Sequence, residues 1–272
     1  MRDEVLILAE PGSTHDGDLD HMLRLVDIAA AVGCDVFKNQ WTSSPERMCE
    51  RRRAPDYLDA YRRIAYPADW HPRVSDRCHE KGLEYACSVY LAEDVATVEP
   101  HCAFLKTASF EAMDGQLRAA LKPYQDRVIV SAGMASFPEI DKILDSAWAV
   151  LWCVSAYPTP DAEANLAAIQ RLKQRRPWAR IGYSDHCLHP LSGALAIAAG
   201  AKLVEFHLRG PECERANPDY AVSRLGDTYR ARFSEAGEYV AAIRDAETLL
   251  GHGEVGRRPL CEEPMRKFRV GS

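Results

Sequence analysis

Eight short β-rich runs, each followed by enough chain for a helix, constrain the fold of this sequence more than any other feature. Most runs begin roughly 20–30 residues after the previous one, which leaves room for one helix and two loops. Strands that alternate with helices pair in parallel, and eight such units in 272 residues predict a single-domain α/β fold, the (β/α)₈ TIM barrel. An open doubly wound sheet is the alternative, but no GxGxxG turn follows the first run. The runs are VLILAE (5–10), CDVFKNQ (34–40), LEYACS (83–88), AFLKTAS (103–109), RVIVSAG (127–133), AVLWCVS (149–155), ARIGYSD (179–185) and KLVEFHL (202–208).

The spacing of apolar residues between the runs predicts helices, and the ends of the chain differ in composition from the rest. We expect the barrel to occupy residues 1–250 and a polar, Gly-rich tail to occupy residues 251–272. The predicted helices include 19–32, which Gly33 ends, 137–147, 163–175 and a last helix over 227–249.

The connection over residues 41–69 is long for a compact domain and is rich in arginine. Its arginines include Arg47, Arg51–Arg53, Arg62 and Arg63. A long loop in a compact domain is often functional, so this loop is a candidate for substrate binding. The alternative is a solvated charged surface.

Charge and composition exclude several classes of protein. The chain carries 34 basic and 40 acidic residues, a net charge of −6, which argues against a nucleic-acid binder but permits a local basic pocket. No stretch approaches the roughly 18 apolar residues of a membrane span, and no signal peptide is evident. The nine cysteines are scattered without a CxxC pair, as expected for reduced thiols in a cytoplasmic protein.

The C-terminal ends of the eight runs carry most of the polar side chains that could do chemistry. In a barrel of this type the active site lies at these ends, and polar groups there need partners such as a phosphorylated ligand and a metal. Histidines end two consecutive runs, close enough to bind one Mn²⁺, Zn²⁺, Co²⁺ or Fe²⁺ ion, although each could instead be a structural histidine. The strand-end residues are Glu10, Lys38, Gln40, Ser88, Lys106, Ser109, Glu111, Ser131, Ser155, Tyr157, Ser184, Asp185, His186 and His207.

The two strand-end lysines admit three interpretations. Lys38 and Lys106 could bind phosphate or carboxylate, form salt bridges to Glu10 or Glu111, or form a Schiff base. Three cysteines near strand ends are expected to be small core residues rather than nucleophiles; these are Cys87, Cys153 and Cys187.

Ordered motifs across roughly residues 5–250 resemble those of the sialic acid synthase (N-acetylneuraminate synthase, NeuB) family. AEPGSTHDGD (9–18) is similar to that family's opening AEIG-x-NH-x-G, and VFKNQ (36–40) to its KxQ. The other similar segments are LKTASFE (105–111), VSAGM (130–134), CVSAYPTP (153–160), GYSDH (182–186), VEFHL (204–208) and NPDYAVS (217–223).

The resemblance implies a metal-dependent barrel that condenses phosphoenolpyruvate with an aldose or other aldehyde acceptor. The product would be a 2-keto-3-deoxy sugar acid of the nonulosonic type, with release of phosphate. By the same resemblance Mn²⁺ is the expected metal, with Mg²⁺, Co²⁺, Zn²⁺ and Fe²⁺ as alternatives, and the protein is expected to be a homodimer. Carried over by motif, Glu10 is the acid/base; His186 and His207 bind the metal; Lys38, Ser88, Lys106, Ser109, Ser131, Tyr157 and Ser184 surround phosphoenolpyruvate; and Glu111 and Asp219 face the acceptor.

The sequence departs from the family pattern in ways that leave the acceptor open. Thr14, Ser88–Val89, Trp152, Phe206, Leu208 and Arg209 replace residues usual in the family. The resemblance stops where the family's C-terminal antifreeze-like domain would begin, so we expect a different aldehyde or a separate protein that covers the site. Two other functions remain alternatives, a pyruvate-releasing C–C lyase of the same fold and a non-catalytic binding barrel.

Overall fold

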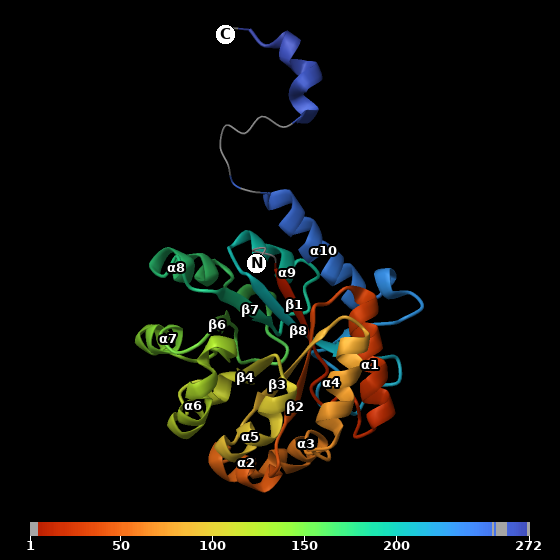
Figure 1. The fold of residues 1–272 in the computed structure, drawn as a ribbon, viewed down its shortest axis with the longest axis vertical. Helices are drawn as coiled ribbons and strands as arrows, with labels where there is room; N and C mark the ends of the chain where they lie inside the picture. The colour runs from red at the N-terminus through yellow and green to blue at the C-terminus, as the bar shows by residue number, and fades with distance from the viewer. Residues whose placement is uncertain (1–4, 252, 254–259, 271–272) are drawn as a thin grey trace.

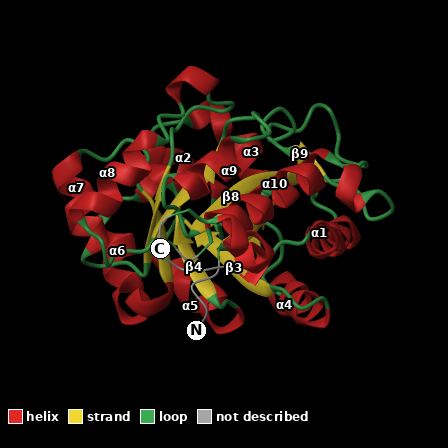
Figure 2. Ribbon diagram, turned by 90° about the horizontal axis from the view of Figure 1, so that it is seen from above, coloured by secondary structure: helices red, strands yellow, loops and turns green. Residues whose placement is uncertain are grey.

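A computed structural model of the chain describes residues 5–251, 253 and 260–270, and within these residues the eight expected strands are all present. They pair in parallel in sequence order, and β1 also pairs with β8, which closes the barrel. Figure 2 shows the strands in the centre with the helices around them. The predicted TIM barrel is therefore confirmed. The strands are β1 (Leu6–Glu10), β2 (Val36–Trp41), β3 (Glu84–Val89), β4 (Phe104–Thr107), β5 (Val128–Ser131), β6 (Ala149–Trp152), β7 (Ile181–Asp185), β8 (Leu203–Arg209) and a short β9 (Arg224–Leu225).

The helices run along the outside of the barrel (Figure 1). In α1, the Asp18 side chain accepts a hydrogen bond from the backbone N–H of His21 at the start, and Gly33, at φ 92°, ends the helix as predicted. The α-helices are α1 (Leu19–Val32), α2 (Pro45–Arg52), α3 (Leu58–Arg63), α4 (Trp70–Glu80), α5 (Val95–Val98), α6 (Gly115–Leu121), α7 (Phe137–Leu144), α8 (Ala167–Arg175), α9 (Ser192–Ala198) and α10 (Glu235–Leu250).

Several predicted boundaries were wrong for local physical reasons. The last helix begins at Glu235 rather than 227, because Ser234 caps it by accepting from the backbone N–H of Gly237. A 3₁₀ turn, η6 (Asp161–Glu163), precedes α8, which therefore begins later than expected. The expected loop over 41–69 contains α2, the 3₁₀ turn η1 (Pro55–Tyr57) and α3, so it is an ordered insertion.

Two apolar layers hold the barrel together. One lies between the strands and the surrounding helices, and a smaller one fills the barrel interior with Leu8, Val36, Ala86, Ile129, Ala149, Leu151 and Leu203. Complete burial of a Leu, Ile or Val side chain is worth about 1.5–3 kcal/mol. Gly182 leaves room in this interior, because a Cβ there would lie 2.4 Å from Leu151 Cδ2. This apolar interior fills one end of the barrel, and polar side chains lie at the other end.

The described part of the C-terminal tail follows α10. α10 ends at Leu250, and within the described tail residues 261–270 are exposed and include the 3₁₀ segment η8 (Leu260–Phe268). The boundary expected at residue 250 stays a prediction.

Eight of the nine free cysteines are buried. Among the described helices none combines the length and apolarity that crossing a bilayer requires.

Candidate active site

A cavity of about 830 Å³ opens at the C-terminal ends of the barrel strands. Eleven of the twelve site side chains predicted from sequence line it. The twelfth, Lys38, is fully buried and lies with its Nζ 2.5 Å from Oε2 of Glu10. The barrel thus brings the whole predicted set together, although this leaves the role of each residue open. The eleven are Glu10, Ser88, Lys106, Ser109, Glu111, Ser131, Tyr157, Ser184, His186, His207 and Asp219.

Two lysines and two carboxylates form one connected group, of which Glu10, Lys106 and Glu205 line the cavity and Lys38 lies buried behind them. Lys38 lies between Glu10 and Glu205, with its Nζ 3.7 Å from Glu205 Oε2. Lys106 Nζ is 2.9 Å from Glu205 Oε1, which also accepts a hydrogen bond of 2.8 Å from Ser184 Oγ. The salt bridge from Lys38 to Glu10 was one of the sequence-based alternatives, whereas the shared partner Glu205 was not anticipated.

The position of Glu205 on its strand predicts that it belongs to the site. It precedes His207 by two residues on the same strand, and side chains two apart on a strand face the same side. Gln40 follows Lys38 by the same spacing, lines the cavity and donates a hydrogen bond from Nε2 to Oε1 of Glu10. Both residues therefore belong to the site.

Opposing influences set the ionisation of Glu10. Burial would raise the pKa of this carboxyl, but the charges of Lys38, His207 and Lys106 and the hydrogen bond from Gln40 lower it well below its usual range. Glu10 is therefore an anion at neutral pH. Burial lowers the pKa of Lys106, yet the carboxylates of Glu205 and Glu10 outweigh burial and raise it.

Hydroxyl groups surround the lysines. Ser88 Oγ accepts a 2.8 Å hydrogen bond from Lys38 Nζ, and Ser155 Oγ donates one of 2.9 Å to Ser109 Oγ. Ammonium and hydroxyl donors around a buried space suit the oxygens of a phosphate or carboxylate ligand.

The two strand-end imidazoles lie close together beside these lysines and hydroxyls. The ring centroids of His186 and His207 are 5.6 Å apart, and the Tyr157 ring lies 4.1 Å from that of His186. His186 Nδ1 lies 2.6 Å from the carbonyl oxygen of Val154. With its proton on Nδ1, His186 keeps Nε2 for a ligand.

The chemistry of this pair fits a divalent cation. Burial, followed by the charge of His207, lowers the pKa of His186 to about 4, so its ring is neutral near pH 7. His207 Nδ1 is buried without a hydrogen-bond partner among the described residues. No group of three or more His, Cys, Asp and Glu side chains is arranged for a metal in that part of the chain, so oxygens of substrate or water would complete the coordination.

The outer half of the cavity is walled by α2, η1 and α3. The Arg52 guanidinium donates to both carboxylate oxygens of Glu111, at 2.7 Å each, and to Tyr61 Oη at 3.3 Å. Its Cζ lies 4.8–5.3 Å from the ring centroids of Tyr61, Tyr90 and Phe110. The wall is therefore aromatic, and the positive charge of Arg52 in it is balanced by the carboxylate of Glu111.

Asp219 is held against the turn that follows β1. Its Oδ2 accepts 2.7 Å and 2.6 Å hydrogen bonds from the backbone N–H and the Oγ of Ser13. Gly12, at φ 56°, allows the approach, because a Cβ there would lie 2.6 Å from that oxygen. The departures at Trp152 and Phe206 lie outside the lining: Trp152 Nε1 donates to Ala164 O at 3.1 Å, and the Phe206 ring packs 5.2 Å from that of Tyr239.

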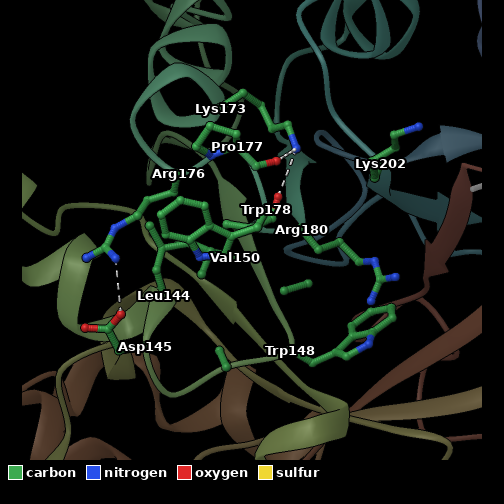
Figure 3. A pocket seen from close by; sticks show the side chains of 13 residues that line it. Leu144, Asp145, Trp148, Val150, Lys173, Arg176, Pro177, Trp178, Arg180 and Lys202 are labelled. Atoms are coloured by element: carbon green, nitrogen blue, oxygen red, sulfur yellow. Dashed lines mark hydrogen bonds and ion pairs between the residues drawn. The ribbon is translucent and has the colours of Figure 1, made fainter.

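A second cavity, of about 450 Å³, is built from residues near the N-terminal ends of β6, β7 and β8 (Figure 3). Its polar groups have structural tasks, since Lys173 Nζ donates to the carbonyls of Pro177 and Ala179 at 3.0 Å each and Arg176 pairs with Asp145 at 3.5 Å. Its lining contains no histidine or cysteine, whereas the larger cavity is lined by eleven of the predicted site residues.

Comparison with known protein families gives a match over most of the chain. The model of the NeuB family matches residues 25–255. The chain belongs to the NeuB family.

Relatives of this NeuB-family chain extend over most of its length. The chain is 27% identical to a pseudaminic acid synthase of Campylobacter jejuni, covering 98% of this chain and 80% of the relative. It is 30% identical to the spore coat polysaccharide biosynthesis protein SpsE of Bacillus subtilis, covering 92% and 69%. Among solved structures, an N-acetylneuraminic acid synthetase of Leptospira borgpetersenii, in complex with citrate, superposes with a TM-score of 0.83 at 27% identity, covering 98% and 91%.

Proposed function

We propose that this NeuB-family barrel is a synthase that condenses phosphoenolpyruvate with an aldose or other aldehyde acceptor. The products are a 2-keto-3-deoxy sugar acid of the nonulosonic type and phosphate. The observation that carries this proposal is the coexistence, in one cavity, of a buried lysine–hydroxyl floor, an anionic Glu10 and a pair of imidazoles. The synthases among its relatives support the same reaction class.

The floor binds the trianionic substrate. Lys106 and the serines that line the cavity hold the phosphate and carboxylate oxygens of phosphoenolpyruvate. Lys38 lies buried behind them and adds its positive charge, and Glu205 keeps both ammonium groups in place. Carbon 3 of phosphoenolpyruvate attacks the acceptor aldehyde carbon, and carbon 2 becomes electron-poor. The lysines stay protonated and no Schiff base forms.

Glu10 then acts as the base. Water adds to carbon 2, and the Glu10 carboxylate takes the proton that this water loses. The tetrahedral intermediate breaks its C–O bond to phosphate while its carbon 2 hydroxyl gives its proton to the departing phosphate, which forms the carbonyl of the sugar acid. The proton on Glu10 passes to the alkoxide that the acceptor aldehyde became, which gives the new hydroxyl. The low pKa of Glu10 keeps it deprotonated before this step.

His186 and His207 would hold the divalent cation, for which we propose Mn²⁺. A cation there would supply Lewis-acid polarisation of the acceptor aldehyde. Tyr157 covers the His186 ring and limits the access of water to that side of the cavity.

The acceptor lies against the outer wall, where Glu111 and Asp219 can accept hydrogen bonds from its hydroxyls. Both arginines of α2 that line the cavity are already neutralised, Arg51 by Asp114 and Arg52 by Glu111. This balance favours an uncharged acceptor over a phosphorylated one. The homodimer and the cytoplasmic location stay predictions.

The deciding experiment measures phosphate release from phosphoenolpyruvate and Mn²⁺ in the presence of a panel of free aldoses and their 6-phosphates, together with product mass. We expect release that depends on a free aldose and yields the condensed sugar acid. Release of pyruvate from a sugar acid instead would indicate the lyase, and no turnover with any aldehyde would indicate a binding protein. The variant His207→Ala should lose bound metal and turnover together, and full turnover without metal would remove the imidazole pair from the mechanism.

A further inference from the structure

Arg224, on the short strand β9, contacts the ends of both strands that carry the imidazoles. β9 pairs in parallel with β8, and Arg224 lies opposite Leu208, the residue after His207. Its Nη2 is 2.9 Å from Oδ2 of Asp185, the residue before His186. The guanidinium also donates to the carbonyls that follow His186, to Cys187 at 2.7 Å and Leu188 at 3.1 Å.

This contact is buried and fully engaged. Arg224 is 5% exposed and Asp185 2% exposed. Asp185 Oδ1 accepts from the backbone N–H of Cys187 at 2.8 Å and from Tyr183 Oη at 3.0 Å, while Oδ2 also accepts from Tyr239 Oη at 2.5 Å. Asp185 does not line the cavity, so its carboxylate orients backbone rather than binding substrate.

The arrangement has one geometric consequence. Arg224 hydrogen-bonds to the residues on both sides of His186, Asp185 and Cys187. Its backbone pairs with Leu208, which follows His207. Arg224 therefore joins the two strand ends, through its guanidinium to the end of β7 and through its backbone to the end of β8. Removal of a residue that holds a metal ligand in place, without touching the metal, typically weakens metal binding about 10- to 100-fold.

We propose that Arg224 is a positioning residue that sets the separation of His186 and His207 through Asp185 and the β7 end. This inference rests on the proposed role of the two histidines in metal binding. Arg224 touches neither substrate nor metal in this proposal, and its effect is the preorganisation of the site.

The test measures Mn²⁺ affinity of the full chain without substrates, by the electron paramagnetic resonance signal of free Mn²⁺. Arg224→Met should weaken Mn²⁺ binding about 10- to 100-fold, and Arg224→Lys should fall between this variant and the unsubstituted protein. The matched control is Arg244→Met. Arg244 makes the same kinds of contact elsewhere, at 2.6 Å to Asp35 Oδ2 and 2.8 Å to the carbonyl of Val5, and its loss should leave Mn²⁺ affinity unchanged.

A milder variant protects the test against misfolding. Tyr239→Phe keeps the ring and removes one hydrogen bond to Asp185, and it should weaken Mn²⁺ binding several-fold. Binding within twofold of the unsubstituted protein by a folded Arg224→Met, or by Tyr239→Phe if Arg224→Met does not fold, overturns the inference. Failure of the unsubstituted protein to bind Mn²⁺ would instead refute the metal site itself.

Discussion

At the scale of single residues, Glu10 shows how neighbours rather than burial decide what a carboxyl can do. The residue is 3% exposed, which alone would favour its neutral form, yet two lysines hold it as an anion. We predict that Glu10→Gln keeps phosphoenolpyruvate binding, because Lys38 retains Ser88 and Glu205, while turnover falls about 10²–10⁴-fold. Single-turnover phosphate release and calorimetric binding would separate the two effects. Near-normal turnover would exclude Glu10 as the base.

Glu205 allows a prediction about pH. Its charge is the largest influence that raises the pKa of Lys106 against burial. In Glu205→Gln this influence is lost, so the pKa of Lys106 should fall and the ammonium should deprotonate at a lower pH. The alkaline limb of kcat/KM for phosphoenolpyruvate should therefore move to lower pH. An alkaline limb identical to that of the unsubstituted protein would show that Lys106 does not need Glu205.

The residues missed from sequence share a physical reason. Strand parity could have found Glu205, and it could have marked Gln40, which the sequence analysis places only at a strand end, as a site residue, because both lie two positions from a predicted site residue. The pairing of Arg52 with Glu111 could not be found this way, since it joins residues 59 apart through the arrangement of α2 over the cavity. Tertiary contacts of long side chains depend on helix placement, which local pattern does not specify.

At the scale of elements, the insertion that contains α2 and α3 is an ordered wall. Tyr57 lines the cavity at 61% exposure, so an incoming sugar can stack on its ring. We predict that Tyr57→Ala raises the acceptor KM about fivefold, for the loss of about 1 kcal/mol of ring contact, and leaves the KM for phosphoenolpyruvate unchanged. The matched control is Arg47→Glu on α2, because Arg47 is absent from the cavity lining and pairs with Glu93. An unchanged acceptor KM in Tyr57→Ala would show that the acceptor does not contact the Tyr57 ring.

The elements also show why strands were easier to predict than their boundaries. Eight buried β-rich runs are visible because each must be apolar on its packed faces. Several predicted runs extend too far, since the small residues after a strand, such as Ala108–Ser109 after β4, continue the composition of the run while the chain already turns into a 3₁₀ segment. The sequence of 41–69 predicts a loop because its helices are short and expose most of their charged side chains.

At the scale of the whole molecule, buried histidines couple stability to pH. Burial lowers the pKa of His15 and of His71 to about 4, with His21 adding to the effect at His15 and His101 at His71. Both lie outside the cavity lining, and His71 Nδ1 is 2.9 Å from Tyr85 Oη.

The sign follows from the unfolded state. An unfolded histidine takes up a proton near pH 6.5, whereas these two stay neutral in the folded protein down to about pH 4. The unfolded chain therefore binds more protons between these values, and the free energy of unfolding falls as pH falls through this window. Each such histidine contributes a slope of up to about 1.4 kcal/mol per pH unit.

We predict that His71→Gln reduces the slope of unfolding free energy by about this amount between roughly pH 4.5 and 6, as measured by urea titration. The exposed His79→Gln is the control and should keep the full slope. Parallel curves for His71→Gln and the unsubstituted protein would mean that His71 is protonated in the folded state as readily as in the unfolded one.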